Sequence, residues 1–539
     1  MYRLWPIIID AKALHSRVVL SQTLTPERAT GVTLAAAARK PAGRYDPVAV
    51  AVLTVILSLA GASRPSLWFD EAATISAANN RSLGDMWRML GNIDAVHGLY
   101  YLLMRGWFMV SPATEFWSRV PSGLIVGVAG AGVVVLAKRF STRSVAVCSG
   151  VMFAILPRTT WAGIEARSYA FTAAIAVWLT ILLVAAVRRA RPSLWLLYAL
   201  VLPLAILLNI CLVFLVPVYG ALMRILSARR PTVIWWTATS ASVVLALTPF
   251  VLFAHGQRFQ VAWIFPIGTR TFGDVTVQQY FDKSVPAAVA AGIVIAAALV
   301  VVWRRPDRKP DSDTRTLLRI TLAWIVIPTA ALVVYSAAIE PVYYPRYLCF
   351  TAPAMAVLLG ICIVTVARHP LAIAGVLFAL AAVATPNYIV SQRGPYAKEG
   401  MDSSQIADLL TFHAAAGDCL LLDNTTAWKP GPIRPITAVR PATYGKLQDL
   451  DRGMAAANRH TLWDGAIPEW AVANRVKQCH VMWTVSERDK MLPDHARGAS
   501  LPPGPRMARA PAYRVQARFG FHIVERWQFS FAQVTKSTR

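Results

Sequence analysis

The chain has 539 residues, of which 56% are hydrophobic and 15% are charged, and its mean hydropathy is +0.47. The apolar residues are gathered in long runs, which excludes a soluble protein of this size. The formal net charge of +26 does not indicate a nucleic-acid partner, because Lys and Arg form short clusters between the hydrophobic runs and so signal membrane topology. We therefore predict an α-helical polytopic membrane protein surrounded by membrane lipids.

The first part of the chain, residues 1–46, carries several basic residues and few acids, and no signal-peptide cleavage pattern ends it. Positive flanks stay in the cytoplasm, so we expect a cytoplasmic N-terminal segment. The first span, about 47–63, then runs outward, and residues 64–117 form a long external loop. Within that loop one stripe with helical spacing predicts a helix lying in the membrane interface: Leu83, Met86, Trp87 and Leu90.

Ten further hydrophobic runs alternate with basic clusters, and every strong cluster falls on the side of the N-terminus. A single miscounted helix would break this alternation, so the alternation supports the number of spans. We place the predicted transmembrane domain at residues 47–391. Its eleven expected spans are about 47–63, 120–136, 145–156, 169–187, 194–208, 210–226, 233–253, 287–303, 317–338, 348–366 and 371–383.

The last region, residues 392–539, is less hydrophobic and follows the last outward span. We predict a small extracytoplasmic α/β domain here, because short apolar runs alternate with turn residues. Residues 500–512 are rich in Pro, Arg and Ala and are expected to form a loop. The expected elements are a helix at 406–416, strands at 419–423 and 480–485, and a hairpin or strand pair within 519–534.

The six cysteines show no metal-ligand spacing. Cys419 and Cys479 each precede a predicted strand of the last domain, so a disulfide between them is sterically plausible in an extracytoplasmic domain. Two unpaired buried thiols fit the sequence equally well. The other four lie in or beside apolar runs and are expected to be small core residues: Cys148, Cys211, Cys349 and Cys362.

An acidic pair, Asp70 and Glu71, follows closely after the first span. Ionisable groups at membrane depth are functional-site hypotheses, since they are costly to hold there unless they are solvated, paired or used. A carboxylate can deprotonate a hydroxyl group, and we interpret Asp70 as the general base of a membrane glycosyltransferase. The alternative is a solvated loop acid just beyond a helix end.

The remaining candidate residues also lie in the external loops. Arginines can hold a phosphate through two hydrogen bonds, and aromatic rings can line a sugar or prenyl groove. These residue types on one membrane face are what transfer of a sugar from a lipid phosphate requires. The candidates are the acidic or orienting residues Glu71, Asp94, His97 and Glu165, the phosphate-binding residues Arg167, Arg258 and Arg346, and the groove residues Trp68, Tyr100, Tyr101, Trp263 and Tyr344.

Each of these residues also has a structural interpretation. The Tyr and Trp residues could be anchors of the aromatic belt at the membrane interface. Arg167 and Arg346 could pair with Glu165 and Glu340 as structural bridges, and His97 could start a helix without binding anything. The acids and the histidine of the first loop permit a divalent cation, but no ligand spacing requires one, so we assign no metal site and no cofactor.

Five short motifs, in order, resemble those of the GT-C superfamily of integral-membrane glycosyltransferases that use polyprenyl-phosphate sugars. The chain is most similar to the bacterial branch with protein O-mannosyltransferase-like and aminoarabinose-transferase-like enzymes. The resemblance covers about the first 390 residues, and the usual proline pair after the histidine is replaced by Gly98 and Leu99. The motifs are Phe69-Asp70-Glu71, His97 to Leu102, Glu115 to Ser122, Glu165 to Tyr169 and Tyr344 to Leu348.

The resemblance implies a polyprenyl-phosphate sugar donor on the outer leaflet and transfer with inversion in one displacement. Asp70 would accept the proton of the acceptor hydroxyl, while Arg346 and Arg167, with Arg258 as a weaker candidate, would neutralise the leaving phosphate. Glu71, His97 and Glu165 would orient the base or bind sugar hydroxyls. All of this requires the Asp70 carboxylate and the Arg346 guanidinium to share one pocket above the bilayer.

For the sugar, the resemblance and an Ala-, Val- and Arg-rich composition typical of a GC-rich genome suggest mannose and an actinobacterial plasma-membrane enzyme with a lipoglycan or other envelope glycan as acceptor. Arabinofuranose, aminoarabinose and a protein acceptor remain open. A non-catalytic alternative is a lipid-linked-sugar flippase or an assembly scaffold, and a receptor-like protein is a third. A transporter would place its polar residues near the midplane and show repeat symmetry. Here they gather at the outer ends of spans.

Overall fold

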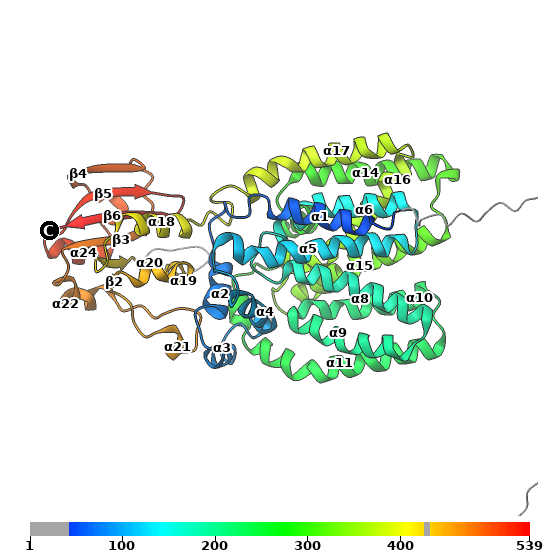
Figure 1. Ribbon diagram of the computed structural model, residues 1–539, viewed down its shortest axis with the longest axis horizontal. Coiled ribbons are helices and arrows are strands. Elements are labelled where there is room, and N and C mark those ends of the chain that lie inside the picture. Colours follow the sequence, from blue (N-terminus) through cyan, green and yellow to red (C-terminus); the bar gives the residue numbers. More distant parts are fainter. Residues whose placement is uncertain (1–42, 425–431) are drawn as a thin grey trace, which may run out of the picture. The chain divides into compact units, whose positions relative to one another are not determined.

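Figure 1 shows the computed structural model of the chain, which describes residues 43–424 and 432–539. Residues 45–539 form one compact unit, and every element below belongs to it. The predicted cytoplasmic segment, 1–46, lies almost wholly outside the described residues.

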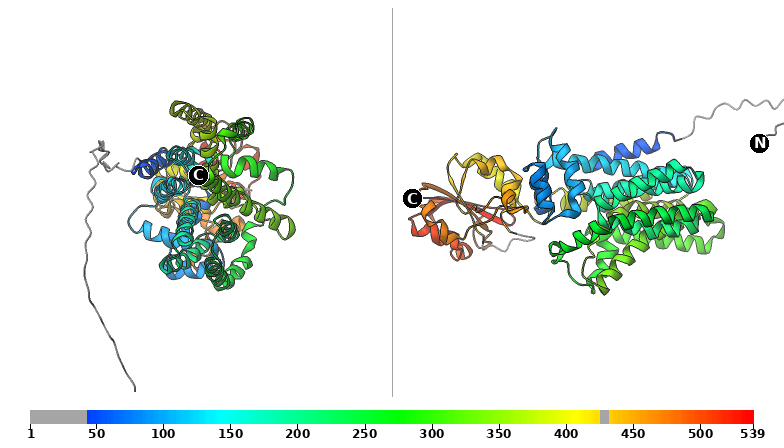
Figure 2. Two further views of the ribbon diagram at one scale, coloured as in Figure 1. Left: turned by 90° about the vertical axis from the view of Figure 1, so that its right-hand side faces the viewer. Right: turned by 90° about the horizontal axis from the view of Figure 1, so that it is seen from below.

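All eleven expected spans are helices, and they run lengthwise beside one another (Figures 1 and 2). Within the described residues, seven helices are long and apolar enough to cross a membrane, and four shorter apolar helices accompany them. The chain is therefore an α-helical polytopic membrane protein. The helices are α1 (Asp46–Leu59), α5 (Glu115–Lys138), α6 (Arg143–Ile155), α8 (Tyr169–Arg189), α9 (Pro192–Leu208), α10 (Leu215–Ile225, after η2, Ile210–Phe214), α11 (Arg230–Gly256), α14 (Val285–Arg304), α15 (Ser312–Ala338), α16 (Ala352–Val366, after η6, Pro345–Thr351) and α17 (Pro370–Pro386, continued by η7, Asn387–Gln392).

Several helix ends differ from the predicted ones for local reasons. Helix α1 ends at Leu59, earlier than expected, because Gly61 has a φ of 73° and turns the chain. Helix α5 begins at Glu115, earlier than expected, because the Thr114 side chain accepts a hydrogen bond from the backbone N–H of Trp117. Caps of this kind carry no hydropathy signal.

Glycines on α5 allow α1 to pack closely against it. A Cβ atom at Gly127 would lie 2.9 Å from the carbonyl oxygen of Ala51 and 2.4 Å from a methyl group of Val55. Gly123 and Gly130 face the same helix. Small residues at such spacings let backbones approach, which compensates for the weak hydrophobic drive between helices in lipid. This contact holds the end of α1, and with it the start of the first loop.

The first loop contains three helices, α2 (Phe69–Ala78), α3 (Leu83–Leu90) and α4 (Gly98–Phe108). Helix α3 confirms the helix predicted from the apolar stripe. The stripe is divided, however, because Met86 and Leu90 are buried in the protein while Leu83 and Trp87 are exposed. Helix α2 has no clear periodicity, since nearly all its residues are buried.

The C-terminal domain is built on a six-stranded sheet with the strand order β2-β1-β3-β6-β5-β4. Strand β1 pairs in parallel with β2 and β3, and the remaining neighbours pair antiparallel. The predicted α/β domain is confirmed, with the expected helix as α18 (Ser403–His413). The strands are β1 (Cys419–Leu422), β2 (Gln448–Asp449), β3 (Val481–Glu487), β4 (His495–Leu501), β5 (His522–Gln528) and β6 (Ala532–Thr538).

Both faces of the parallel strands are covered. Leu420 and Trp483 belong to a core shared with α18, whereas Leu421 and Met482 belong to a second core on the opposite face. That second face packs against α22 (Ala473–Val476) and α24 (Pro511–Arg518). Because residues alternate between faces, each buried strand contributes to both cores.

The predicted loop at 500–512 is wrong. This stretch contains the end of β4, the short helix α23 (Gly504–Met507) and the start of α24. Proline at the first positions of α23 and α24 begins these helices rather than excluding them. Strand β4 was not expected, because an exposed edge strand lacks the apolar alternation that identifies a half-buried one.

The cysteine alternatives are decided by the structure. Cys419 and Cys479 form a disulfide, with their Cα atoms 5.9 Å apart. The other four cysteines are unbonded, and three of them are buried, in agreement with small core residues.

Candidate functional site

Asp70 lies in the first turn of α2, where backbone N–H groups favour a negative charge. Its Oδ2 atom is 3.2 Å from Nη2 of Arg346 and 4.0 Å from Nε of Arg167. All three side chains are largely buried. The expected proximity of Asp70 and Arg346 is therefore present, although the two residues are far apart in the sequence of the membrane domain.

Three aromatic rings surround the Arg346 guanidinium. Its central carbon lies 4.8 Å from the ring centre of Tyr344, 5.1 Å from that of Trp68 and 5.8 Å from that of Trp263. Trp263 also packs edge-on against Tyr344, with ring centres 4.9 Å apart. The faces of these rings stabilise the buried positive charge and fix its position beside Asp70.

Arg167 is held in a second set of contacts behind Asp70. Its Nη1 donates to the hydroxyl of Tyr101 at 3.0 Å, and that hydroxyl donates to Asp94 Oδ2 at 2.5 Å. Its Nη2 lies 3.2 Å from Nε2 of His97. Burial raises the pKa of Asp94, and the nearby Arg167 partly offsets this effect.

His97 is a neutral imidazole in this arrangement. Burial and the positive charges of Arg167 and Arg346 hold its pKa well below the usual 6.5. Its Nε2 can then accept the hydrogen bond from Arg167. The ring thus orients the arginine without adding charge to the site.

Glu71 points into a different set of contacts. Its carboxylate accepts from Nε and Nη2 of Arg119 at 2.8 and 2.6 Å and from the N–H of Ala166 at 3.1 Å. Arg119 also donates to the carbonyl oxygens of Ala62, Pro65 and Ser66. The pair is fully buried and ties the segment after α1 to α5, which positions the neighbouring Asp70. Arg119 stands in the quoted motif Glu115 to Ser122, but sequence reasoning did not single it out.

Glu165 lies between Trp68 and a lysine that sequence reasoning missed. Its Oε2 accepts the indole N–H of Trp68 at 3.0 Å, and its Oε1 pairs with Lys398, which also donates to Ile164 O at 3.0 Å. Burial raises the pKa of Glu165 to about 7 and lowers that of Lys398. Lys398 follows the last span in a polar stretch without a motif, so the sequence carried no signal for it.

The structural bridges considered as alternatives are not formed. Arg167 and Arg346 contact Asp70, whereas Glu340 pairs with Arg258 at 3.2 Å and with His255 at 3.3 Å. The Arg258 side chain is more than half exposed. Tyr100 is fully buried, and its ring packs edge-on against Phe171.

The side chains beside Asp70 leave hydrogen-bond capacity open. The buried Nε atoms of Arg167 and Arg346 have no hydrogen-bond partner among the described residues. Over the same residues, no group of three or more His, Cys, Asp and Glu side chains could hold a metal ion. The cluster can therefore offer a carboxylate and two guanidiniums to a ligand.

The sequence matches no protein-family model and no curated protein sequence. Solved structures do match. The structure of ArnT from Cupriavidus metallidurans in the apo state has a TM-score of 0.56 at 12% identity, over 91% of this chain and 97% of that one. The same protein bound to undecaprenyl phosphate gives 0.50 at 13% identity over the same shares. The chain thus has the fold of ArnT, the GT-C fold.

Proposed function

We propose that the protein is an inverting glycosyltransferase that moves a sugar from a polyprenyl-phosphate donor to an acceptor hydroxyl. The observation that carries the proposal is the contact of the Asp70 carboxylate with the guanidiniums of Arg346 and Arg167. It joins a base to two phosphate-binding groups, each with an N–H that has no partner in the described part of the chain. A structure with the same fold, ArnT from Cupriavidus metallidurans, holds undecaprenyl phosphate.

The proposed reaction is a single displacement. The acceptor oxygen attacks the anomeric carbon while its proton passes to Asp70. The bond between that carbon and the phosphate oxygen breaks, and its electron pair leaves with the lipid phosphate. Arg346 and Arg167 neutralise the growing negative charge on that phosphate, so that no acid is required. Attack from the face opposite to the leaving group inverts the anomeric carbon.

We place the site on the outer face of the plasma membrane, with the N-terminus in the cytoplasm. The disulfide between Cys419 and Cys479 supports this orientation, since such bonds persist in oxidising compartments. The basic clusters between the spans support it independently. Mannose as the sugar and an actinobacterial lipoglycan or envelope glycan as the acceptor complete the proposal.

The test uses the full-length protein in nanodiscs with polyprenyl-phosphate mannose and envelope lipoglycan. The wild type should transfer mannose, and Asp70→Asn should abolish transfer while the protein stays folded and inserted. Asp85→Asn is the matched control, because Asp85 lies on α3, where its partners are Ser82 and the exposed Arg88 rather than Arg346 or Arg167. An Asp70→Asn protein with near-normal turnover would reject the mechanism. Movement of the donor across the bilayer without transfer would favour the flippase.

A further inference from the structure

The C-terminal domain contains a pocket at the carboxyl end of its parallel strands. Asp423 directly follows β1, and its N–H donates to the carbonyl of Val485 in β3 at 2.9 Å. Since Leu421 pairs with Thr484, the same register places Asp423 beside Ser486 on one face of the sheet. Arg506 of α23 and Arg509 line a pocket at this point together with Asp423 and Ser486, and its volume is about 120 Å³.

The position of the pocket follows from the topology. From the end of β1 the chain leaves to β2 on one side, whereas from the end of β3 it continues to the strands on the other side. In open α/β sheets, ligands bind where two neighbouring parallel strands send their connections in opposite directions. Strands β1 and β3 are such a pair, and the pocket lies at their carboxyl ends.

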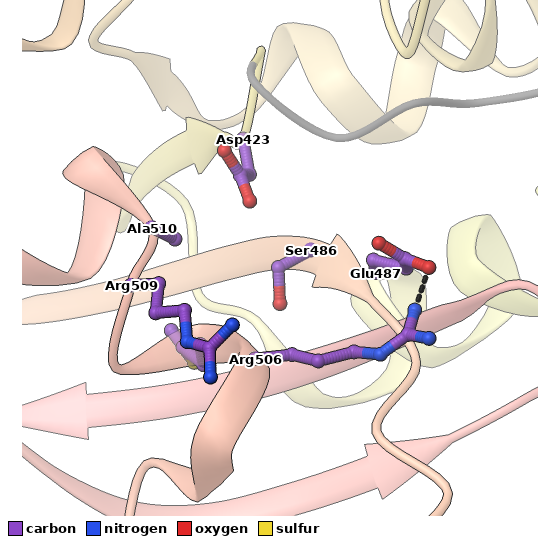
Figure 3. A pocket seen from close by; sticks show the side chains of 7 residues that line it. Asp423, Ser486, Glu487, Arg506, Arg509 and Ala510 are labelled. Atoms are coloured by element: carbon purple, nitrogen blue, oxygen red, sulfur yellow. Dashed lines mark ion pairs between the residues drawn. The ribbon is translucent and has the colours of Figure 1, made fainter.

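Figure 3 shows the pocket from close by. In this view Asp423 lies above Ser486, Arg509 lies to its left, and the ion pair of Arg506 with Glu487 lies to its right. Ser486 is 1% exposed, and its hydroxyl has no hydrogen-bond partner among the described residues. An unsatisfied buried polar group costs about 1–3 kcal/mol, which a ligand hydroxyl would recover.

The charge of the lining defines the class of ligand. Among the described residues of the lining, two carboxylates and two guanidiniums balance, so that an anion would be repelled by the acids and a cation by the arginines. A neutral hydroxyl can donate to a carboxylate and accept from a guanidinium at the same time. The volume admits several hydroxyl-sized groups but no lipid chain.

We infer that this pocket binds a neutral, polyhydroxylated sugar unit of the acceptor glycan, apart from the Asp70 site. That the sugar belongs to the acceptor rests on the proposed function. That the pocket binds a sugar is argued from the residues of the pocket alone. Binding of a second sugar unit would hold the growing acceptor glycan near the membrane domain.

The experiment measures binding of α-linked mannotriose and an α-linked arabinofuranose trisaccharide to the full-length protein by calorimetry. Arg509→Ala should weaken binding at least tenfold, because it removes charge-assisted hydrogen bonds to the sugar. A tenfold change in Kd corresponds to about 1.4 kcal/mol of binding free energy. Ser486→Ala should weaken it several-fold. Arg514→Ala on α24 is the matched control in the same domain and should leave affinity unchanged. Arg509 lies at the pocket rim, so the protein is expected to fold without its side chain.

The inference is overturned if neither trisaccharide binds, if Arg509→Ala leaves the affinity unchanged, or if inorganic phosphate or Ca²⁺ binds more tightly in the same pocket. Asp70→Asn should keep the trisaccharide affinity of the wild type. If trisaccharide binding depends on Arg509 but no donor supports transfer, the proposed function fails and the sugar site stands. If transfer occurs and Arg509→Ala changes neither affinity nor acceptor KM, the sugar site alone fails.

Discussion

Trp68 donates its indole N–H to the buried carboxylate of Glu165 at 3.0 Å, and its ring face lies against the guanidinium of Arg346. The carboxylate is in turn paired with Lys398, from the segment that leads to the C-terminal domain. The order Lys398, Glu165, Trp68, Arg346 is thus a line of contacts that ends at Asp70. These contacts connect the start of the C-terminal domain with the proposed phosphate-binding arginine.

The first prediction concerns Lys398 as a positioning residue. Lys398→Met should cost about 3 kcal/mol of stability, because it leaves the Glu165 carboxyl buried without its partner. It should also raise the donor KM more than the acceptor KM, since Trp68 loses its fixed position against Arg346. Thermal unfolding and steady-state kinetics measure the two effects.

Two further variants serve as controls for this prediction. Lys283→Met removes an exposed lysine of a surface pair and should change stability by less than about 0.5 kcal/mol. The double variant Lys398→Met with Glu165→Gln should lose less than the sum of the single losses. Additive losses would contradict a direct coupling between the two side chains.

The second prediction concerns Arg346. Arg346→Ala should weaken donor binding about 10- to 100-fold, the equivalent of a hydrogen bond between charged groups, and should leave the acceptor KM nearly unchanged. Arg346→Lys should recover only part of the loss, because an ammonium lacks the fork that binds two phosphate oxygens. Arg88→Ala, which removes the exposed partner of Asp85 on α3, is the matched control. Equal effects on donor and acceptor would identify Arg346 as a structural residue.

The third prediction concerns pH and Asp402, just before α18. Burial raises its pKa from 3.8 to about 6, partly offset by hydrogen bonds from the backbone N–H groups of Ala532 and Phe531. A folded-state pKa above the unfolded one gives stability that is present below about pH 3.8 and is lost as the pH rises through 6. The shift of about two units corresponds to about 3 kcal/mol.

The measurement compares apparent unfolding temperatures of the wild type and Asp402→Asn between pH 4 and pH 7. The wild type should lose stability across this range, and the variant should show a flatter profile. Asp313→Asn, an exposed acid at the start of α15, should behave as the wild type does. Parallel profiles for the wild type and Asp402→Asn would contradict the assignment.

The sequence by itself determined the helical membrane domain, because hydropathy is a local property and each span must satisfy its backbone within one continuous segment. It also indicated the α/β class of the last domain through the buried runs at β1 and β3. It did not predict β4 or the helices after it. The residues of β4 are largely exposed, and exposure removes the apolar pattern that identifies a strand. The helices α23 and α24 carry proline in their first turn, which we interpreted as a sign of a loop.

Only the tertiary structure decided which charges meet. Glu71, beside Asp70 in the chain, faces Arg119, while Asp70 faces Arg346 from the far end of the membrane domain. Adjacent residues on a helix point in different directions, so the chain order cannot assign their partners. The disulfide and the pairing of Lys398 with Glu165 were decided in the same way. Each depends on the packing of two segments that are distant in the sequence, and no local sequence pattern predicts such a contact.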